Sequence, residues 1–187
     1  KPMYLDEGSL RTPTVALSQA RKEIVRMAEI SQMMAEEVFP VFSSRKRKDM
    51  AGHELKEEAL DNLQRSIHQY LVQLYGDNNT LEDQATITAQ MNMVNGIERL
   101  GDTTTNIANS ITVALDNNIY LSDQAMEEYR TISETALEFP RLATSALREN
   151  RVDILPRARE LEEELDRMRQ STSSYAHRTL PTERRVY

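Results

Sequence analysis

Two pairs of acidic residues in this 187-residue chain are spaced for metal binding. Glu98 and Asp102 are four positions apart, and so are Glu57 and Asp61. On a helix this spacing puts both carboxylates on one face, with about 5–6 Å between their Cβ atoms. Two such pairs facing each other across antiparallel helices would gather four carboxylates, as in the bundles that hold metal ions. Oxygen ligands favour hard ions, or iron and manganese, over a thiolate zinc site.

The position of Glu98 distinguishes it from an ordinary solvated acid. Ile87, Met91 and Val94 precede it at steps of four, three and four. Glu98 therefore continues an apolar stripe on one side of a helix. A carboxylate placed there must pair with a cation, bind a metal ion or change its pKa. An ion pair with an arginine of a neighbouring helix is the competing interpretation.

Three neighbours bear on the same site. Gly101 lies inside the predicted helix, where glycine costs about 1 kcal/mol relative to alanine. Its presence indicates a close approach of two helices or space for a ligand. Gln64 and His68 continue the face of the Glu57–Asp61 pair, and we interpret His68 as a surface or rim histidine rather than a metal ligand.

Composition excludes several classes of function. Cysteine is absent, so disulfides, thiolate metal sites and thiol nucleophiles are excluded. The net charge of −7 disfavours nucleic acid as a partner, because phosphate binding needs a basic surface. No apolar run reaches the roughly 18–20 residues of a membrane span. We find no nucleophile–base pair, glycine-rich phosphate loop or zinc-protease motif, and therefore predict no enzymatic activity and no bound small-molecule substrate.

Five amphipathic segments predict an all-α fold. The chain has only five glycines and six prolines, which indicates few and long elements. Residues 1–13 read as an irregular lead-in. Thr14 is the predicted N-cap of the first helix and Asp153 that of the last. The Phe39-Pro40 pair should bend the first helix, and Pro140 should interrupt the fourth. The predicted helices cover residues 14–42, 53–75, 80–116, 122–148 and 153–177.

A faint internal repeat divides the chain. Leu17-Ser18 recurs as Leu121-Ser122, and residues 59–63 resemble residues 164–168 at nearly the same offset. We interpret residues 14–117 as a first three-helix bundle. Residues 118–187 would then form a second bundle that is incomplete, because it has only two helices.

The third predicted helix carries a string that resembles the PhoU family. Residues 97–102 read Ile-Glu-Arg-Leu-Gly-Asp, and residues 106–108 read Asn-Ile-Ala. The family has a Glu-Arg-(Ile/Leu)-Gly-Asp core followed by Asn-Ile-Ala. The resemblance implies PhoU-like antiparallel three-helix bundles and metal clusters bound through Glu/Asp-x-x-x-Asp pairs, with iron, manganese or zinc as the ion. In this sequence the pairs are Glu57 with Asp61 and Glu98 with Asp102.

The start of the chain narrows the resemblance. The Tyr-Leu-Asp of residues 4–6, with Leu10, Pro13 and Glu23, is similar to the segment after the membrane part of bacterial sodium/phosphate cotransporters. Those transporters carry a C-terminal PhoU-like domain. The chain begins with Lys1, so we expect it to be part of a longer protein.

This resemblance implies a regulatory or structural domain of a sodium-dependent phosphate transporter, at the cytoplasmic face of the bacterial inner membrane. The implied partners are the membrane transport domain of the same chain and, as a second assembly, another copy in a homodimer. The domain is expected to tune transport rather than to carry phosphate.

Alternatives remain open at this stage. A free-standing PhoU-type regulator of phosphate uptake and signalling is the principal one, and a metal-dependent enzyme on a helical bundle is another. The family pattern is also incomplete, since Gly96 stands where an acid is expected and Glu162 with Asp166 lacks a partner on a sixth helix. The basic run at residues 45–48 is either a solubilising loop or a contact with anionic lipid.

Overall fold

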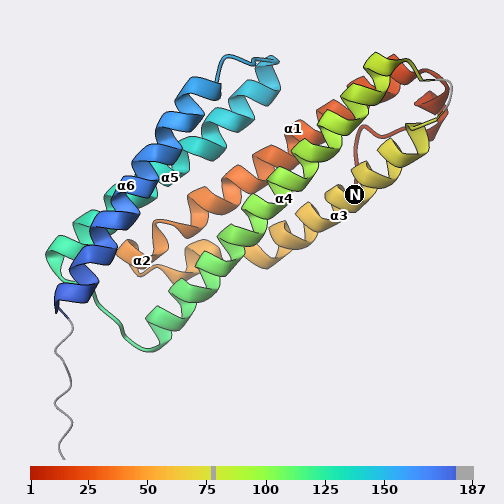
Figure 1. Ribbon diagram of the computed structural model, residues 1–187. Coiled ribbons are helices and arrows are strands. Elements are labelled where there is room, and N and C mark those ends of the chain that lie inside the picture. The colour runs from red at the N-terminus through yellow and green to blue at the C-terminus, as the bar shows by residue number, and fades with distance from the viewer. Residues whose placement is uncertain (77–78, 180–187) are drawn as a thin grey trace, which may run out of the picture.

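The computed structural model describes residues 1–76 and 79–179, with side chains described up to residue 170. These residues form helices joined by short connections (Figure 1), and no β-strand occurs among them. The all-α prediction is therefore confirmed. The elements are η1 (Glu7–Arg11), α1 (Pro13–Val38), α2 (Val41–Ser44), η2 (Arg47–Met50), α3 (His53–Leu74), α4 (Leu81–Asp116), α5 (Asp123–Glu149) and α6 (Leu155–Thr179), where η denotes a 3-10 helix.

The helices α1, α3 and α4 pack against one another and share the larger of two apolar cores (Figure 1). The leucine and isoleucine stripe of α3 faces inward because its members recur every three or four residues. Each fully buried side chain of this kind stabilises the fold by about 1.5–3 kcal/mol. The core includes Ile24, Met27, Leu60, Leu63, Ile67, Leu71, Ile87 and Val94, none more than 2% exposed.

A second core lies where α1 ends. Pro40 cannot donate a backbone hydrogen bond, so α1 stops at Val38 and α2 restarts at Val41. The predicted bend at Phe39-Pro40 is confirmed. Phe39 and Phe42 pack with Ile111 of α4 and Leu137 of α5.

The remaining two helices form a hairpin beside α1. The helix α5 packs against α1, and α6 packs against α5. The two helices run alongside each other in Figure 1. The division into one bundle over residues 14–117 and a partial one over 118–187 stays a prediction. Within the described residues, none of the helices has both the length and the apolar character needed to cross a membrane.

The lead-in is attached to the bundle rather than separate from it. Glu23 of α1 is fully buried, and its Oε2 accepts hydrogen bonds from the backbone N–H groups of Met3 and Tyr4, both at 2.8 Å. Its other oxygen accepts from Arg26 at 2.6 Å. On α3, the Tyr70 hydroxyl lies 3.0 Å from the carbonyl oxygen of Asp6. The first residues therefore pack on α1 and α3.

Three local predictions are wrong. The first helix begins at Pro13 rather than after Thr14, because proline suits the first helical position, where its missing N–H has no partner. The last helix begins at Leu155, and Asp153 instead accepts a hydrogen bond from Arg151 at 3.0 Å. The fourth helix continues through Pro140, which is buried within α5. The packing of the buried Pro140 side chain compensates for the backbone hydrogen bond that proline cannot donate.

The N-terminal end of α4 agrees with its sequence. Thr80 Oγ1 accepts a hydrogen bond from the Asp83 N–H at 3.1 Å. The Asp83 carboxylate accepts one from the Thr80 N–H at 3.0 Å. This reciprocal capping box satisfies two backbone donors and determines where the helix that carries Glu98 and Asp102 begins.

Candidate functional site

Gly101 determines how closely α3 and α4 approach. It is buried, and a Cβ atom added to it would overlap the side chain of Leu60 on α3. Only glycine permits such an approach without a shift of the neighbour. The interpretation of Gly101 as a close-packing residue is confirmed. Because Asp61 follows Leu60 and Asp102 follows Gly101, this crossing brings the acids of α3 towards those of α4.

Glu98 interacts electrostatically with acids on both helices. Its side chain is half-buried, and that burial is the main cause that raises the pKa of its carboxyl group above the ordinary value. The negative charges of Asp102 and Asp61 raise it further, and a hydrogen bond to Asp102 acts in the same direction. Arg99 lowers it by a smaller amount. Two of the other predicted site residues, Asp61 and Asp102, therefore act on Glu98.

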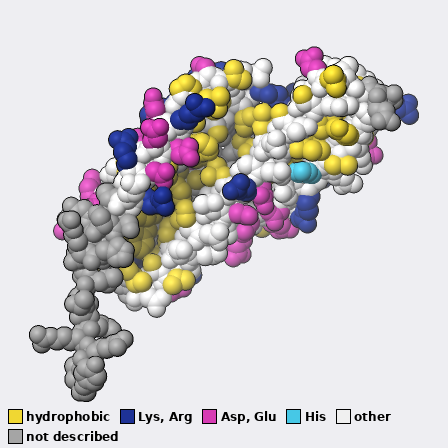
Figure 2. All heavy atoms as spheres, in the orientation of Figure 1, with side chains coloured by type: hydrophobic (Ala, Val, Ile, Leu, Met, Phe, Trp, Pro, Cys, Tyr) yellow, Lys and Arg dark blue, Asp and Glu magenta, His cyan; other side chains and the backbone are white. Residues whose placement is uncertain are grey.

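Glu57 completes the predicted set from one turn earlier on α3. It is half-buried, and its charge acts on His53 at the start of that helix. Figure 2 shows acidic side chains gathered beside the middle of α4. Across the described parts of the chain, however, no three Asp, Glu or His side chains form a group that could hold a metal ion. The acids as placed are not a preassembled metal site, and metal binding by Glu57, Asp61, Glu98 and Asp102 stays a prediction.

Two further residues, His68 and Gly96, lie at the edge of the surface that carries these acids. His68 is half-buried, and its Nε2 lies 2.9 Å from Asn95 Oδ1 of α4, which suits a rim histidine. Gly96 is exposed, and a Cβ atom added there would meet nothing within 4 Å. An acid at position 96, as in the family pattern, would therefore fit without a clash.

His53 is a buried polar group that sequence reasoning missed. It is 6% exposed, its Nε2 lies 3.0 Å from Thr105 Oγ1 of α4, and its Nδ1 is buried without a hydrogen-bond partner among the described residues. Burial lowers the pKa of its imidazole, while the charges of Glu57 and Glu37 oppose that shift. A histidine just after Gly52 gives no sequence signal of burial, since the partner is 52 positions away.

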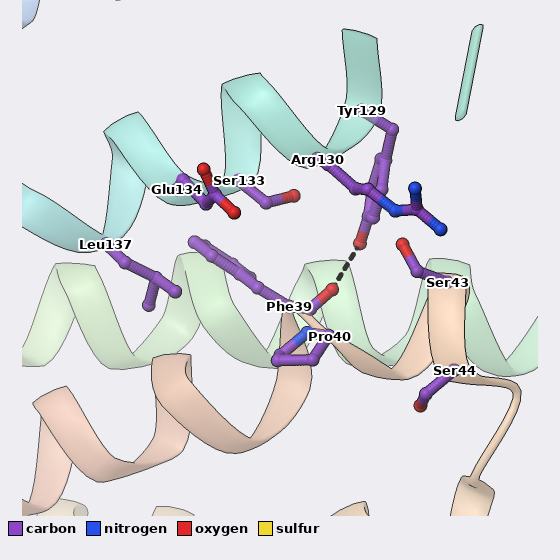
Figure 3. Close-up of a pocket in the computed structure, with 9 residues that line it drawn as sticks. All are labelled: Phe39, Pro40, Ser43, Ser44, Tyr129, Arg130, Ser133, Glu134 and Leu137. Atoms are coloured by element: carbon purple, nitrogen blue, oxygen red, sulfur yellow. Dashed lines mark hydrogen bonds between the residues drawn. The ribbon is translucent and has the colours of Figure 1, made fainter. Parts of the chain in front are cut away.

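The break after α1 forms a pocket of about 390 Å³ against α5 (Figure 3). Phe39, Pro40 and Leu137 supply its apolar part. The hydroxyl of Tyr129 donates to the carbonyl oxygen of Phe39 at 2.7 Å, and burial raises the pKa of that phenol. Sequence reasoning predicted the break and missed the pocket.

A second, apolar hollow of about 460 Å³ lies between α4 and the α5–α6 hairpin. Ile97 and Leu100 of α4 line it together with Phe139 and Leu147 of α5 and Leu155 of α6. Figure 2 shows hydrophobic side chains along this furrow. Gly96 also borders it, so the absent side chain at that position widens the opening.

Two of three comparisons with known proteins give matches. Residues 24–111 match the PhoU domain family. A curated relative from Salmonella typhimurium, named "Putative inorganic phosphate export protein YjbB", is 25% identical over 138 residues. That match covers 74% of this chain and 23% of the relative, so the chain spans about a quarter of that protein's length. No solved structure matches the chain. All four predicted site residues lie inside the segment matched to the family.

Proposed function

We propose that this chain, which carries a PhoU-like domain in residues 24–111, is a regulatory domain of a phosphate-transport protein. The observation that carries the proposal is the match to a protein named for phosphate export, of which this chain covers only 23%. The rest of such a protein leaves room for a membrane transport part. In this proposal that part is sodium-dependent, is joined to the same chain and places the domain at the cytoplasmic face of the bacterial inner membrane.

The charge distribution supports regulation rather than phosphate binding. The chain has a net charge of −7, which repels an anion from most of its surface. A domain beneath a transporter can still change its rate if its contacts differ between the transporter's states. Such regulation needs no chemical reaction, and the PhoU family assignment also favours a regulatory role over a catalytic one.

Glu57 and Asp61 of α3 with Glu98 and Asp102 of α4 form what we call the acidic face. This face is the part of the domain best suited to such contacts. The pKa of Glu98 is raised because the group is half-buried beside Asp102 and Asp61. Burial and the two neighbouring negative charges therefore make the ionised form of Glu98 less favourable than it is in water. A positive charge placed against this face would stabilise the ionised carboxylate of Glu98. We therefore propose that a basic surface of the transport part contacts Glu98 and Asp102.

A free-standing PhoU-type regulator of phosphate uptake and signalling is the second candidate. The match to the PhoU family is contained within this chain and does not depend on a membrane part. The two candidates differ in whether the same polypeptide moves phosphate.

Reconstitution of the purified full-length protein into lipid vesicles separates the candidates. The transporter proposal predicts uptake of radiolabelled phosphate that requires a sodium gradient. A free-standing regulator would give no uptake in vesicles, although its deletion from cells would change their phosphate content. Absence of both effects would contradict both candidates.

A further inference from the structure

Two segments that are far apart in the sequence meet at one end of the bundle. The Nη1 of Arg45 donates to the backbone oxygen of Ile119 at 2.7 Å, and its guanidinium lies 4.4 Å from the centre of the Tyr120 ring. Arg47 pairs with Asp116 at 2.6 Å. In Figure 1, the end of α2 and the connection from α4 to α5 lie at this same end. We call residues 45–49 with residues 116–121 the basic tip.

The basic tip exposes apolar side chains as well as charges. Ile119, Tyr120 and Leu121 are consecutive, and they are 48%, 71% and 38% exposed. In water, three adjacent apolar side chains are unfavourable when exposed, and such groups mark interaction surfaces. Cation–π contact with Arg45 holds the Tyr120 ring in place. The apolar group is therefore positioned by the basic run rather than left to move independently.

The charge of the basic tip is opposite to that of the whole chain. Four basic side chains outnumber its two acids, Asp49 and Asp116, whereas the chain has a net charge of −7. Lys46 and Lys48 are exposed, and no ion pair holds either of them within the described residues. A negatively charged surface would attract this end and repel most of the remaining molecule.

We propose that the basic tip binds the headgroup region of an anionic lipid bilayer. Each lysine or arginine near such a surface contributes measurably to binding, and tyrosine favours the boundary between headgroups and acyl chains. Ile119 and Leu121, on either side of Tyr120, enter the acyl boundary. The negative charges of an acidic protein could bind the lysines. They would not explain why a consecutive Ile-Tyr-Leu segment is exposed beside those lysines, whereas a bilayer binds both kinds of side chain. This inference is independent of the proposed function in phosphate transport, because it concerns the chain and lipid alone.

Vesicle flotation with the purified chain tests the inference. Vesicles of phosphatidylglycerol and phosphatidylcholine should bind the chain, vesicles of phosphatidylcholine alone should not, and added salt should weaken binding. Joint replacement Lys46→Gln and Lys48→Gln should weaken binding about thirtyfold. The matched control Arg65→Gln with Arg99→Gln removes two exposed charges from α3 and α4 and should leave binding unchanged.

The apolar part is tested by Ile119→Ser with Leu121→Ser. This pair should weaken vesicle binding while circular dichroism shows unchanged helix content. Equal binding of the lysine variant and its arginine control would overturn the proposal, and so would equal binding to charged and uncharged vesicles. Both results concern lipid binding by this chain and leave the outcome of the phosphate-uptake experiment open. Failure of this inference is therefore distinguishable from failure of the proposed function.

Discussion

The helices α3 and α6 are of similar length and are held in place by different forces. Along α3, Leu60, Leu63, Ile67 and Leu71 are each at most 2% exposed and pack against α1 and α4. Among the described side chains of α6, Leu161 is the one buried large apolar group. Over the same described side chains, one ion pair joins α6 to a neighbouring helix, between Arg157 and the exposed Glu138 of α5 at 2.6 Å.

This difference indicates where the molecule can change shape. Exposed ion pairs contribute about 0–1 kcal/mol each, whereas a buried leucine contributes about 1.5–3 kcal/mol. We therefore expect α6 to open locally while α1, α3 and α4 stay folded. Regions of low local stability are the ones that regulatory contacts can shift. The acidic residues at the contact of α3 with α4 thus lie on the stable part, whereas the hairpin that can move packs on α1.

Leucine truncation should show the largest contrast between the two regions. Leu63→Ala should lower the free energy of unfolding by about 3–5 kcal/mol, because three helices surround the cavity that it leaves. Leu161→Ala removes the same atoms from a contact of two helices, which can close around the gap, and should cost about 2–3 kcal/mol. Urea unfolding of both variants measures the difference. Equal losses would show that the hairpin is packed as firmly as the core.

The two glycines of α4 provide the next contrast. Gly101→Ala should lower the free energy of unfolding by about 1–3 kcal/mol, because its Cβ would overlap Leu60 and force α3 away from α4. Gly96→Ala meets open space and should raise stability by up to about 1 kcal/mol through helix propensity. Thermal unfolding compares both with the parent chain. A stabilising Gly101→Ala would contradict the close approach of these helices.

Acid should destabilise the protein through His53. Burial lowers the pKa of this imidazole in the folded state, whereas the unfolded state keeps the ordinary value near 6.5. Above that value both states are neutral, and stability does not depend on this group. As the pH falls below it, the unfolded state binds the proton first, so the free energy of unfolding decreases.

Urea unfolding across this pH range measures the effect of His53. The charged groups that act on the imidazole are Glu37, Glu54, Lys56 and Glu57. His53→Gln should flatten the decrease between neutral pH and the folded-state pKa. An unchanged slope in that variant would assign the pH dependence to other groups.

Glu98 should show the smallest effect, with the opposite sign. Its pKa is raised in the folded state, so the folded state binds the proton more tightly and stability decreases as the pH rises through that raised pKa. Glu98→Gln should therefore raise the melting temperature slightly at neutral pH. Glu58→Gln, which removes an exposed acid elsewhere on α3, should leave it unchanged. A lower melting temperature for Glu98→Gln would show that the carboxylate is stabilising.

Metal binding at the acidic face needs a separate measurement. The prediction of iron, manganese or zinc at Glu57, Asp61, Glu98 and Asp102 can be tested by titrating each ion into the purified chain and following heat. Binding that is lost in Glu98→Gln with Asp102→Asn and kept in Glu58→Gln would support it. Equal binding in both variants would move the ion to another part of the chain.

Local patterns in the sequence predicted most of the helices. The stripe from Leu60 to Leu74 placed α3, and the predicted start of the third helix at residue 80 agrees with α4, which begins at Leu81. Gly101 marked the close crossing, because an interior glycine in a helix is costly unless space is limited. These signals depend on neighbours within a few positions, so one chain suffices to read them.

Contacts between distant segments could not be predicted in the same way. Glu23 accepts from the backbone of Met3 and Tyr4, and Arg45 holds Ile119, yet neither pattern appears in the sequence around these residues. The continuity of α5 through Pro140 likewise depends on what packs against it. Such features arise from tertiary packing, which single-residue preferences do not contain.

Phosphate flux through the full-length protein tests the regulatory proposal most directly. Sodium-driven uptake into vesicles would be compared for the intact protein and for a variant that lacks residues 14–179. The proposal predicts that deletion changes the rate of uptake or its dependence on internal phosphate, while the requirement for sodium stays. Unchanged rate and unchanged dependence on internal phosphate would contradict a regulatory role for this domain.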